Sequence, residues 1–88
     1  MQSRQFVIKN RLGLHARAAA QLVQTANRFE SEVTLIKEDI EVNGKSIMGI
    51  LLLAAPKATE LTVRVDGTDE TECMRFIAEL IEDGFGED

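Results

Sequence analysis

The spacing of apolar residues switches between strand and helix periods along this chain, and that switching constrains the fold more than any other feature. Residues 60–65 alternate strictly between polar and apolar side chains, which predicts a strand with one buried face. Residues 16–29 contain no Gly or Pro and repeat their apolar positions at helical spacing, which predicts an amphipathic helix. The positions i, i+3, i+4 and i+7 of that helix are taken by Ala19, Leu22, Val23 and Ala26. Each segment must bury its apolar side against another.

Further segments complete the pattern. Strands are predicted over residues 5–9, 33–37 and 40–42. Ser46 is a suitable N-cap for a short helix that ends before Pro56. Asp69 and Glu72 resemble a capping box for a last helix, and Gly84 is a suitable residue to end it. The order β-α-β-β-α-β-α predicts a single α+β domain over residues 1–88, with a four-stranded sheet carrying its three helices on one face.

Charge is divided unevenly along the chain. Residues 1–65 hold nine basic and six acidic residues, whereas residues 66–88 hold one basic and nine acidic residues. A nucleic-acid binder of this size normally has a broad basic surface, which this pattern does not favour. The basic residues closest to the only histidine, Arg11 and Arg17, suit a local site for a small anion. The acidic end, residues 79–88, is predicted to be a solvated surface.

Several classes of protein are disfavoured by composition. Cys73 is the only cysteine, so no internal disulfide forms and a reducing compartment is favoured. One Cys and one His do not favour a metal site. The longest apolar run, residues 47–55, is too short to span a bilayer, and residues 1–5 do not resemble a signal peptide. We therefore expect a cytoplasmic monomer without cofactor, metal, nucleic-acid partner or membrane insertion.

The start of the first helix breaks the rules that the other two helices obey. Residues 14–20 offer no Ser, Thr, Asp or Asn to cap the first-turn amides, and Arg17 places positive charge at the positive end of the helix dipole. Uncapped amides and a guanidinium at a helix N-terminus suit an oxyanion such as phosphate. The backbone of Ala16, Arg17 and Ala18 is therefore a candidate phosphate-binding site.

His15 lies beside that candidate site, and its neutral ring can act as a nucleophile. A phosphoryl group on His15 would meet both the free amides and Arg17. No Asp, Glu or Cys accompanies His15 in the local sequence, so hydrolytic or Cys–His chemistry has no support. These residues alone also permit the alternative that His15 is an ordinary surface residue.

Two motifs resemble those of a known family. Gly13-Leu14-His15-Ala16-Arg17 resembles the phosphorylation motif of HPr, the histidine-containing phosphocarriers of the bacterial phosphotransferase system. Residues 43–49, Asn-Gly-Lys-Ser-Ile-Met-Gly, resemble the second motif of that family at the expected distance. The resemblance implies an HPr-like open-faced β-sandwich with an antiparallel sheet.

The resemblance also implies a function. His15 would accept a phosphoryl group from enzyme I, which phosphoenolpyruvate charges, and Arg17 would bind that group. His15 would then pass it to the A-component of an enzyme II sugar permease or of a nitrogen-type regulatory branch. Such a protein is a stoichiometric carrier within a relay rather than a free-standing catalyst.

Further residues acquire roles by the same resemblance. Ser46 is the residue that an HPr kinase/phosphorylase phosphorylates in some bacteria. Residues Ile47, Met48 and Leu51 would dock partner proteins. Two departures stand out, because the family usually has Pro where this chain has Ala18, and many sugar-system members have a polar residue where it has Leu12. The branch, sugar transport or nitrogen-type regulation, therefore stays open.

Two alternatives of other classes remain. One is a regulatory module that binds a transcription factor or an enzyme and is switched by phosphorylation at Ser46 or His15. The other is a ferredoxin-like α+β domain that binds a small ligand or RNA, which the order of the strands in the sheet distinguishes.

Overall fold

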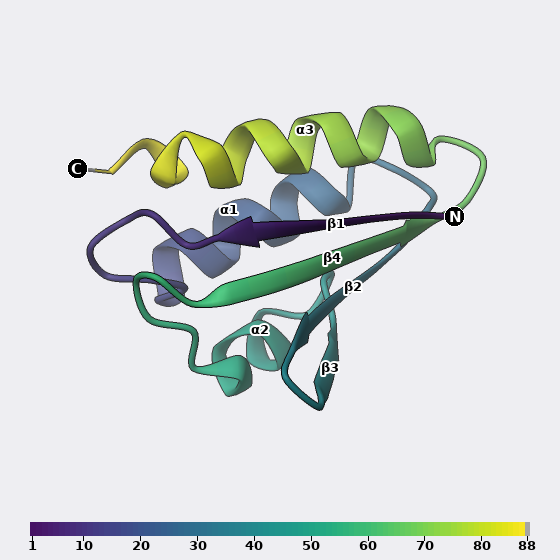
Figure 1. Ribbon diagram of the computed structural model, residues 1–88. Coiled ribbons are helices and arrows are strands. Elements are labelled where there is room, and N and C mark those ends of the chain that lie inside the picture. The colour runs from purple at the N-terminus through teal and green to yellow at the C-terminus, as the bar shows by residue number, and fades with distance from the viewer. Residues whose placement is uncertain (88) are drawn as a thin grey trace.

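The chain folds as a four-stranded antiparallel sheet whose strands follow the order β1-β4-β2-β3 (Figure 1). The computed structural model describes residues 1–87; Asp88, the last residue of the predicted acidic surface, lies outside them. The elements are β1 (Gln2–Val7), α1 (Ala16–Ala26), β2 (Glu32–Lys37), β3 (Ile40–Asn43), α2 (Ile47–Leu53), β4 (Glu60–Asp66), α3 (Glu70–Glu82) and the short turn η1 (Gly84–Gly86). The predicted order and the α+β open-faced sandwich are confirmed.

The core forms where one face of the sheet meets the helices. Strand β4 alternates as its sequence predicts, so that Leu61, Val63 and Val65 are fully buried while their neighbours are not. The apolar stripe of α1 and that of α3 lie against the same face, and Cys73 is buried among them as expected. Burial raises the pKa of the Cys73 thiol to about 11, so this cysteine is an inert packing residue.

Two predicted boundaries are wrong. The first strand covers Gln2–Val7 rather than residues 5–9, because its limits follow the ladder to β4, in which Gln2 pairs with Val65 and Val7 with Glu60. Polar side chains are tolerated there because β1 is an edge strand with one exposed face. Helix α1 ends at Ala26 rather than at Phe29, since the amide of Phe29 donates to the carbonyl of Ala26 in a tighter turn.

The predicted capping box at the start of α3 is also wrong. Asp69 occupies the N-cap position, but its carboxylate does not bond to its own helix. It accepts hydrogen bonds from the amides of Glu30 and Ser31 and from the Ser31 hydroxyl, at 2.9, 3.0 and 2.5 Å. Asp69 therefore ties the start of α3 to the chain between α1 and β2.

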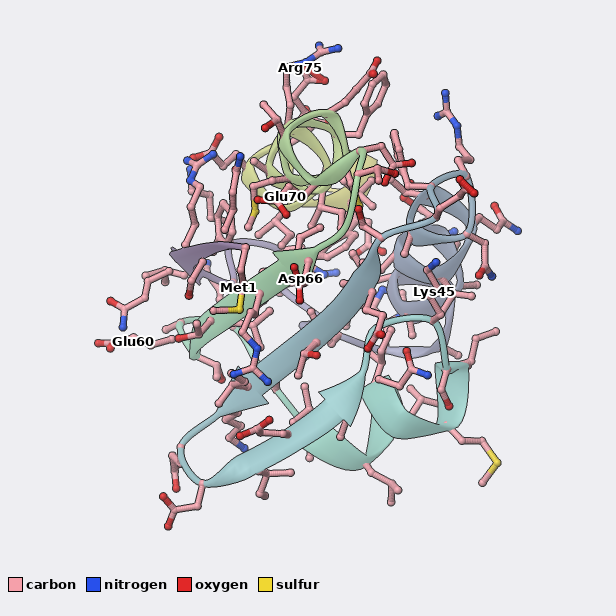
Figure 2. The ribbon with its side chains drawn as sticks, turned by 90° about the vertical axis from the view of Figure 1, so that its right-hand side faces the viewer. Met1, Lys45, Glu60, Asp66, Glu70 and Arg75 are labelled. Carbon is pink, nitrogen blue, oxygen red and sulfur yellow. The ribbon has the colours of Figure 1, made fainter. Side chains whose placement is uncertain are left out.

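The amino terminus is fixed at the same end of the molecule. Figure 2 shows Met1 beside Asp66 and Glu70, at the junction of β4 and α3. The terminal ammonium lies 2.8 Å from the Glu70 carboxylate and 3.9 Å from that of Asp66. This end of the sheet lies far along β1 and β4 from the loop that carries His15, so the charges gathered here do not contribute to the candidate site (Figure 1).

Candidate functional site

The loop between β1 and α1 holds His15 at the end of the sheet opposite Met1. Gly13 has a φ of +68°, and a Cβ there would collide with the carbonyl oxygen of Ala55 and with Pro56. The next amide, that of Leu14, donates to the Ala55 carbonyl at 2.9 Å. Two loops distant in the sequence are therefore fastened together, and His15 follows directly from this junction.

The first turn of α1 is open, as predicted. His15 is the N-cap residue, and no side chain caps the helix. The first backbone bond runs from the amide of Ala19 to the carbonyl of His15, so the amides of Ala16, Arg17 and Ala18 precede the regular ladder. The structure brings these predicted residues together at one helix end. Their roles in binding phosphate remain a prediction.

Glu87 joins this site, which the sequence analysis did not predict. Its carboxylate oxygen Oε2 lies 2.5 Å from His15 Nε2 and 3.6 Å from an Arg17 nitrogen. The Glu87 side chain is only 10% exposed, against 26% for His15 and 70% for Arg17. The prediction of a solvated acidic end is therefore wrong for Glu87. The imidazole is nonetheless open to solvent, and the contacts of Glu87 leave the α1 amides unoccupied.

A left-handed turn delivers Glu87 to the histidine. Gly84, Phe85 and Gly86 follow α3 and have φ values of +64°, +58° and +72°, which form a left-handed turn. A positive φ costs a non-glycine residue about 1–2 kcal/mol, and burial of the Phe85 ring in the core offsets that cost. In the sequence, only the apolar Phe85 between two glycines indicates this turn. That pattern does not indicate that Glu87 contacts His15.

Asn10 completes the arrangement from the other side. Its Nδ2 group donates to the Gly13 carbonyl at 2.7 Å and to Glu87 Oε1 at 3.0 Å. Asn10 Oδ1 is buried and has no hydrogen-bond partner within residues 1–87. Exchanging the two Asn10 atoms would place its oxygen against two acceptors, so the orientation is fixed. The hydrogen bond from Asn10 lowers the pKa of the Glu87 carboxyl most, followed by the contact with His15 and the charge of Arg17. Glu87 is therefore ionised at neutral pH.

Two shallow depressions lie at this site, and His15 lines the second of them. One is lined by Arg11, Leu12, Arg17, Gly86 and Glu87, and is therefore mainly charged. The other is lined by Leu12, Leu14, His15, Ala54, Ala55 and Pro56, and is mainly apolar. Leu12 lines both depressions, so the charged and the apolar surfaces adjoin at this residue.

Several large apolar side chains of α2 and of the loop between β1 and α1 are exposed. Met48 is 74% exposed, and Ile47 and Leu51, also predicted as docking residues, are exposed too. Leu12 and Leu52 extend the same set of exposed apolar side chains, and only Ile50 and Leu53 of α2 are buried. We call residues Leu12, Ile47, Met48, Leu51 and Leu52 the apolar face. Apolar surface of this kind is typical of sites that contact other proteins.

Ser46 caps α2 as predicted. Its hydroxyl oxygen accepts a hydrogen bond from the amide of Gly49 at 3.0 Å. The helix ends at Leu53, and Ala54, with a φ of +50°, turns the chain before Pro56. Ser46 itself is partly exposed.

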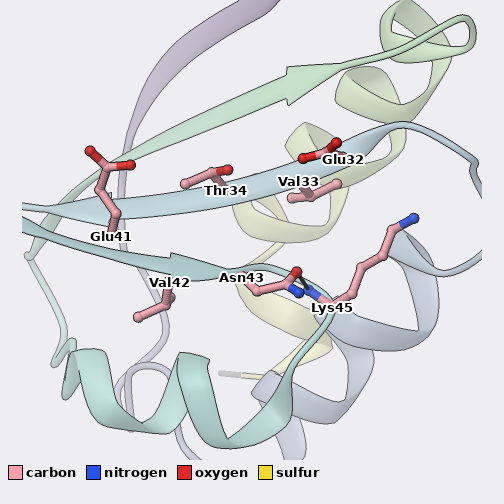
Figure 3. A pocket seen from close by; sticks show the side chains of 7 residues that line it. All are labelled: Glu32, Val33, Thr34, Glu41, Val42, Asn43 and Lys45. Atoms are coloured by element: carbon pink, nitrogen blue, oxygen red, sulfur yellow. Dashed lines mark hydrogen bonds between the residues drawn. The ribbon is translucent and has the colours of Figure 1, made fainter.

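A separate depression lies over the edge formed by β2 and β3. Figure 3 shows its lining, in which the Glu32 and Glu41 carboxylates stand apart from each other. The Lys45 ammonium donates to the Phe29 carbonyl at 2.8 Å and so ties this edge to the end of α1. None of the residues around His15 reaches this depression. Nothing in residues 1–87 gathers three His, Cys, Asp or Glu side chains as a metal would need, and no described helix has the length and apolarity to cross a bilayer.

Sequence comparison finds a known family along nearly the whole chain. The family described as the PTS HPr component phosphorylation site matches residues 2–83. The phosphocarrier protein HPr of Xylella fastidiosa strain 9a5c is 50% identical over 88 residues, covering 100% of this chain and 99% of that protein. HPr of Neisseria meningitidis serogroup A (strain Z2491) is 54% identical over 80 residues, covering 91% and 90% of the two chains.

Solved structures agree as well. The crystal structure of HPr-C-His from Thermoanaerobacter tengcongensis superimposes with a TM-score of 0.96 at 42% identity, covering 100% of this chain and 99% of that one. Fold and sequence together define a phosphocarrier protein of the phosphotransferase system. Within that class, the chain belongs to the HPr family.

Proposed function

We propose that His15 is the residue that carries the phosphoryl group. The observation that supports this proposal is the open first turn of α1, whose amides at Ala16, Arg17 and Ala18 adjoin a solvent-accessible imidazole. Oriented amides and the positive helix end stabilise an anion placed there. The Arg17 side chain, which is largely exposed, supplies a guanidinium that can turn toward the phosphoryl oxygens.

The partners follow from this chemistry and from the family. Enzyme I is the proposed donor, and the A-component of an enzyme II is the proposed acceptor, in either the sugar or the nitrogen-type branch. Both partners would seat on the apolar face, with Ile47, Met48 and Leu51 at its centre. We further propose that the chain acts as one domain, as a monomer in the cytoplasm, and that it serves as a carrier without a cofactor.

Phosphorylation in vitro tests the role of His15. The wild-type protein, incubated with enzyme I and phosphoenolpyruvate, should acquire a phosphate that is labile to acid and stable to base. His15→Ala should acquire none while keeping the circular dichroism spectrum of the wild type. Equal labelling of His15→Ala would overturn the proposal. Purified A-components of the two branches, added to the phosphorylated protein, would identify the acceptor by the rate at which each removes the phosphate.

A second candidate function is a regulatory module switched at Ser46 or His15. The observation that favours it is the position of Ser46, which borders the exposed side chains of Ile47 and Met48. A phosphate at Ser46 would add roughly two negative charges beside an apolar contact surface. Retained partner binding and in-cell function in His15→Ala would favour this role over carriage. The third alternative, a ferredoxin-like ligand or RNA binder, loses support because β4 and β2 occupy the centre of the sheet, whereas that fold centres on its first and third strands.

A further inference from the structure

Glu87 touches the proposed nucleophile, yet phosphoryl carriage as described above gives it no part. Its carboxylate contacts the same imidazole that would attack phosphorus. The inference below rests on the proposed role of His15, and its test separates the two.

The contacts of Glu87 fix where the imidazole proton lies. An ionised carboxylate only accepts hydrogen bonds, so its 2.5 Å contact with Nε2 requires the proton on Nε2. The other carboxylate oxygen is occupied by Asn10 Nδ2, which is itself held by the carbonyl of Gly13. In a neutral imidazole with the proton on Nε2, the free lone pair is on Nδ1.

We propose that Glu87 is a positioning residue for phosphoryl transfer, which holds the His15 proton on Nε2 and presents the Nδ1 lone pair to the incoming phosphorus. As the bond between Nδ1 and phosphorus forms, the bond between phosphorus and the donor breaks, and its electron pair stays with the donor. The ring gains positive charge that is shared by Nε2–H, and the Glu87 carboxylate faces that charge. A fixed counter-charge stabilises such a state without reorganisation during the reaction.

The arrangement is built into the fold rather than formed by a chance surface contact. Three successive left-handed residues and the buried Phe85 ring place Glu87 against His15. Asn10, which aims the carboxylate, is itself only 1% exposed. An ordinary surface ion pair, by contrast, joins two mobile side chains that solvent surrounds.

Glu87 also leaves room for the phosphoryl group. The amides of residues 16–18 donate no hydrogen bond to its carboxylate, whose partners are Asn10, His15 and Arg17. Its separation from Arg17, 3.6 Å, exceeds an ordinary hydrogen bond, so the guanidinium is free to exchange this contact for phosphoryl oxygens. Binding of the anion therefore displaces only the weakest of the three contacts.

The test uses Glu87→Gln, with Glu79→Gln as the matched control. Glu79 lies on α3, exposed and paired with Arg75 at 3.7 Å, so the control makes the same charge change away from His15. In Glu87→Gln, Asn10 Nδ2 continues to donate to the side-chain oxygen, which turns the introduced NH2 group toward His15 Nε2. That donor requires a lone pair on Nε2 and shifts the proton to Nδ1, which blocks the nucleophile.

Two measurements read out this change. Nitrogen-15 NMR of the His15 ring at a pH where the ring is neutral should show the proton on Nε2 in the wild type and a shift toward Nδ1 in Glu87→Gln. The rate of phosphorylation by enzyme I should fall at least about tenfold in Glu87→Gln, as expected for loss of a charge-assisted hydrogen bond. Glu87→Ala, which removes the carboxylate without reversing the proton, should be slowed less. Glu79→Gln should match the wild type in both measurements.

The outcomes separate the inference from the function beneath it. If wild-type His15 acquires no phosphate, the proposed function fails and the inference falls with it. If His15 is phosphorylated on Nδ1 and Glu87→Gln keeps the wild-type rate and ring spectrum, the function stands and the inference is overturned. Equal slowing of Glu87→Gln and Glu79→Gln would also overturn it, because the effect would then come from net charge.

Discussion

The starts of α1 and α2 differ in a way that local stability does not explain. Helix α2 is seven residues long and is capped by the hydroxyl of Ser46, whereas α1 is eleven residues long and has no side-chain cap. A cap residue at the start of α1 would stabilise the unmodified protein by about 1 kcal/mol. The chain instead places an imidazole at that position and a guanidinium in the turn that follows. The difference supports the proposal that the start of α1 binds an anion, whereas the start of α2 is stabilised by its own cap.

The first prediction tests the bare helix start directly. Arg17→Ala should slow phosphorylation of His15 roughly a hundredfold, because it removes a charged donor from the transferring group. The free energy of unfolding should change by less than about 0.5 kcal/mol, since the side chain is exposed and no longer opposes the helix dipole. Rapid-quench labelling and urea denaturation measure the two effects. A large loss of stability with an unchanged transfer rate would contradict the assignment.

The second prediction concerns α3. Its N-cap residue, Asp69, neither caps its own helix nor lies at the proposed anion site. Asp69→Asn should lower the free energy of unfolding at pH 7 more than loss of the single Ser46 cap does, because the carboxylate of Asp69 accepts three hydrogen bonds. The hydrogen bond from the Ser31 hydroxyl, followed by that from the Glu30 amide, lowers the pKa of Asp69 below its usual value of 3.8. A lowered folded-state pKa contributes stability that is complete above the unfolded-state value and is lost as the pH falls through the folded-state value.

Urea denaturation across pH checks this second prediction. The stability difference between wild type and Asp69→Asn should be largest at neutral pH and should shrink as the pH falls below about 4. Asp66→Asn is a suitable control, because Asp66 is exposed and lies 3.9 Å from the terminal ammonium. A difference that stays constant between pH 7 and pH 3 would show that Asp69 acts through packing rather than through its charge.

The third prediction removes the cap that α2 has and α1 lacks. Ser46→Ala should destabilise the protein by about 1 kcal/mol, because the amide of Gly49 loses its acceptor. Phosphorylation of His15 should keep its wild-type rate, since Ser46 makes no contact with the imidazole. Thermal denaturation and the labelling assay measure both. A slower phosphorylation of His15 in Ser46→Ala would contradict the view that the start of α2 serves stability alone.

The fourth and smallest effect is expected from Ala18→Pro, which restricts the backbone in the uncapped first turn of α1. Ala18 belongs to the first turn of α1, where its amide precedes the helical ladder, so Ala18→Pro removes no backbone bond of the helix. The free energy of unfolding should rise by about 0.4–1 kcal/mol through the lower entropy of the unfolded chain. A loss of stability would show that the buried Ala18 position has no room for the ring. The assay is again urea denaturation, with phosphorylation rates recorded alongside.

The sequence predicts those parts of the structure that depend on neighbouring residues. Apolar periodicity located every helix and strand, and the lack of a cap near His15 marked the open turn of α1. The extent of β1 was missed, because it depends on pairing with β4 across more than fifty positions of sequence. Asp69 was misassigned for the same reason, since its competing donors at Glu30 and Ser31 lie on another part of the chain.

Glu87 shows the same limit within the site. It is 72 residues from His15 in sequence, and only the left-handed turn after α3 brings the two together. The acidic composition of the chain's end suggested solvent exposure, which is the ordinary fate of a charged residue near a terminus. Local pattern therefore pointed to His15 and to the open amides of α1, whereas the contact between His15 and Glu87 required the folded chain.

The close approach of Gly13 to the Ala55–Pro56 backbone has a consequence for how this protein meets its partners. The close approach of Gly13 and the hydrogen bond from Leu14 hold the backbone before His15 in one place. If the proposed function holds, the donor and the acceptor would each meet the same loop backbone in turn. A carrier of this kind would present the same loop conformation to every partner, so that adjustments on binding would fall to the partner.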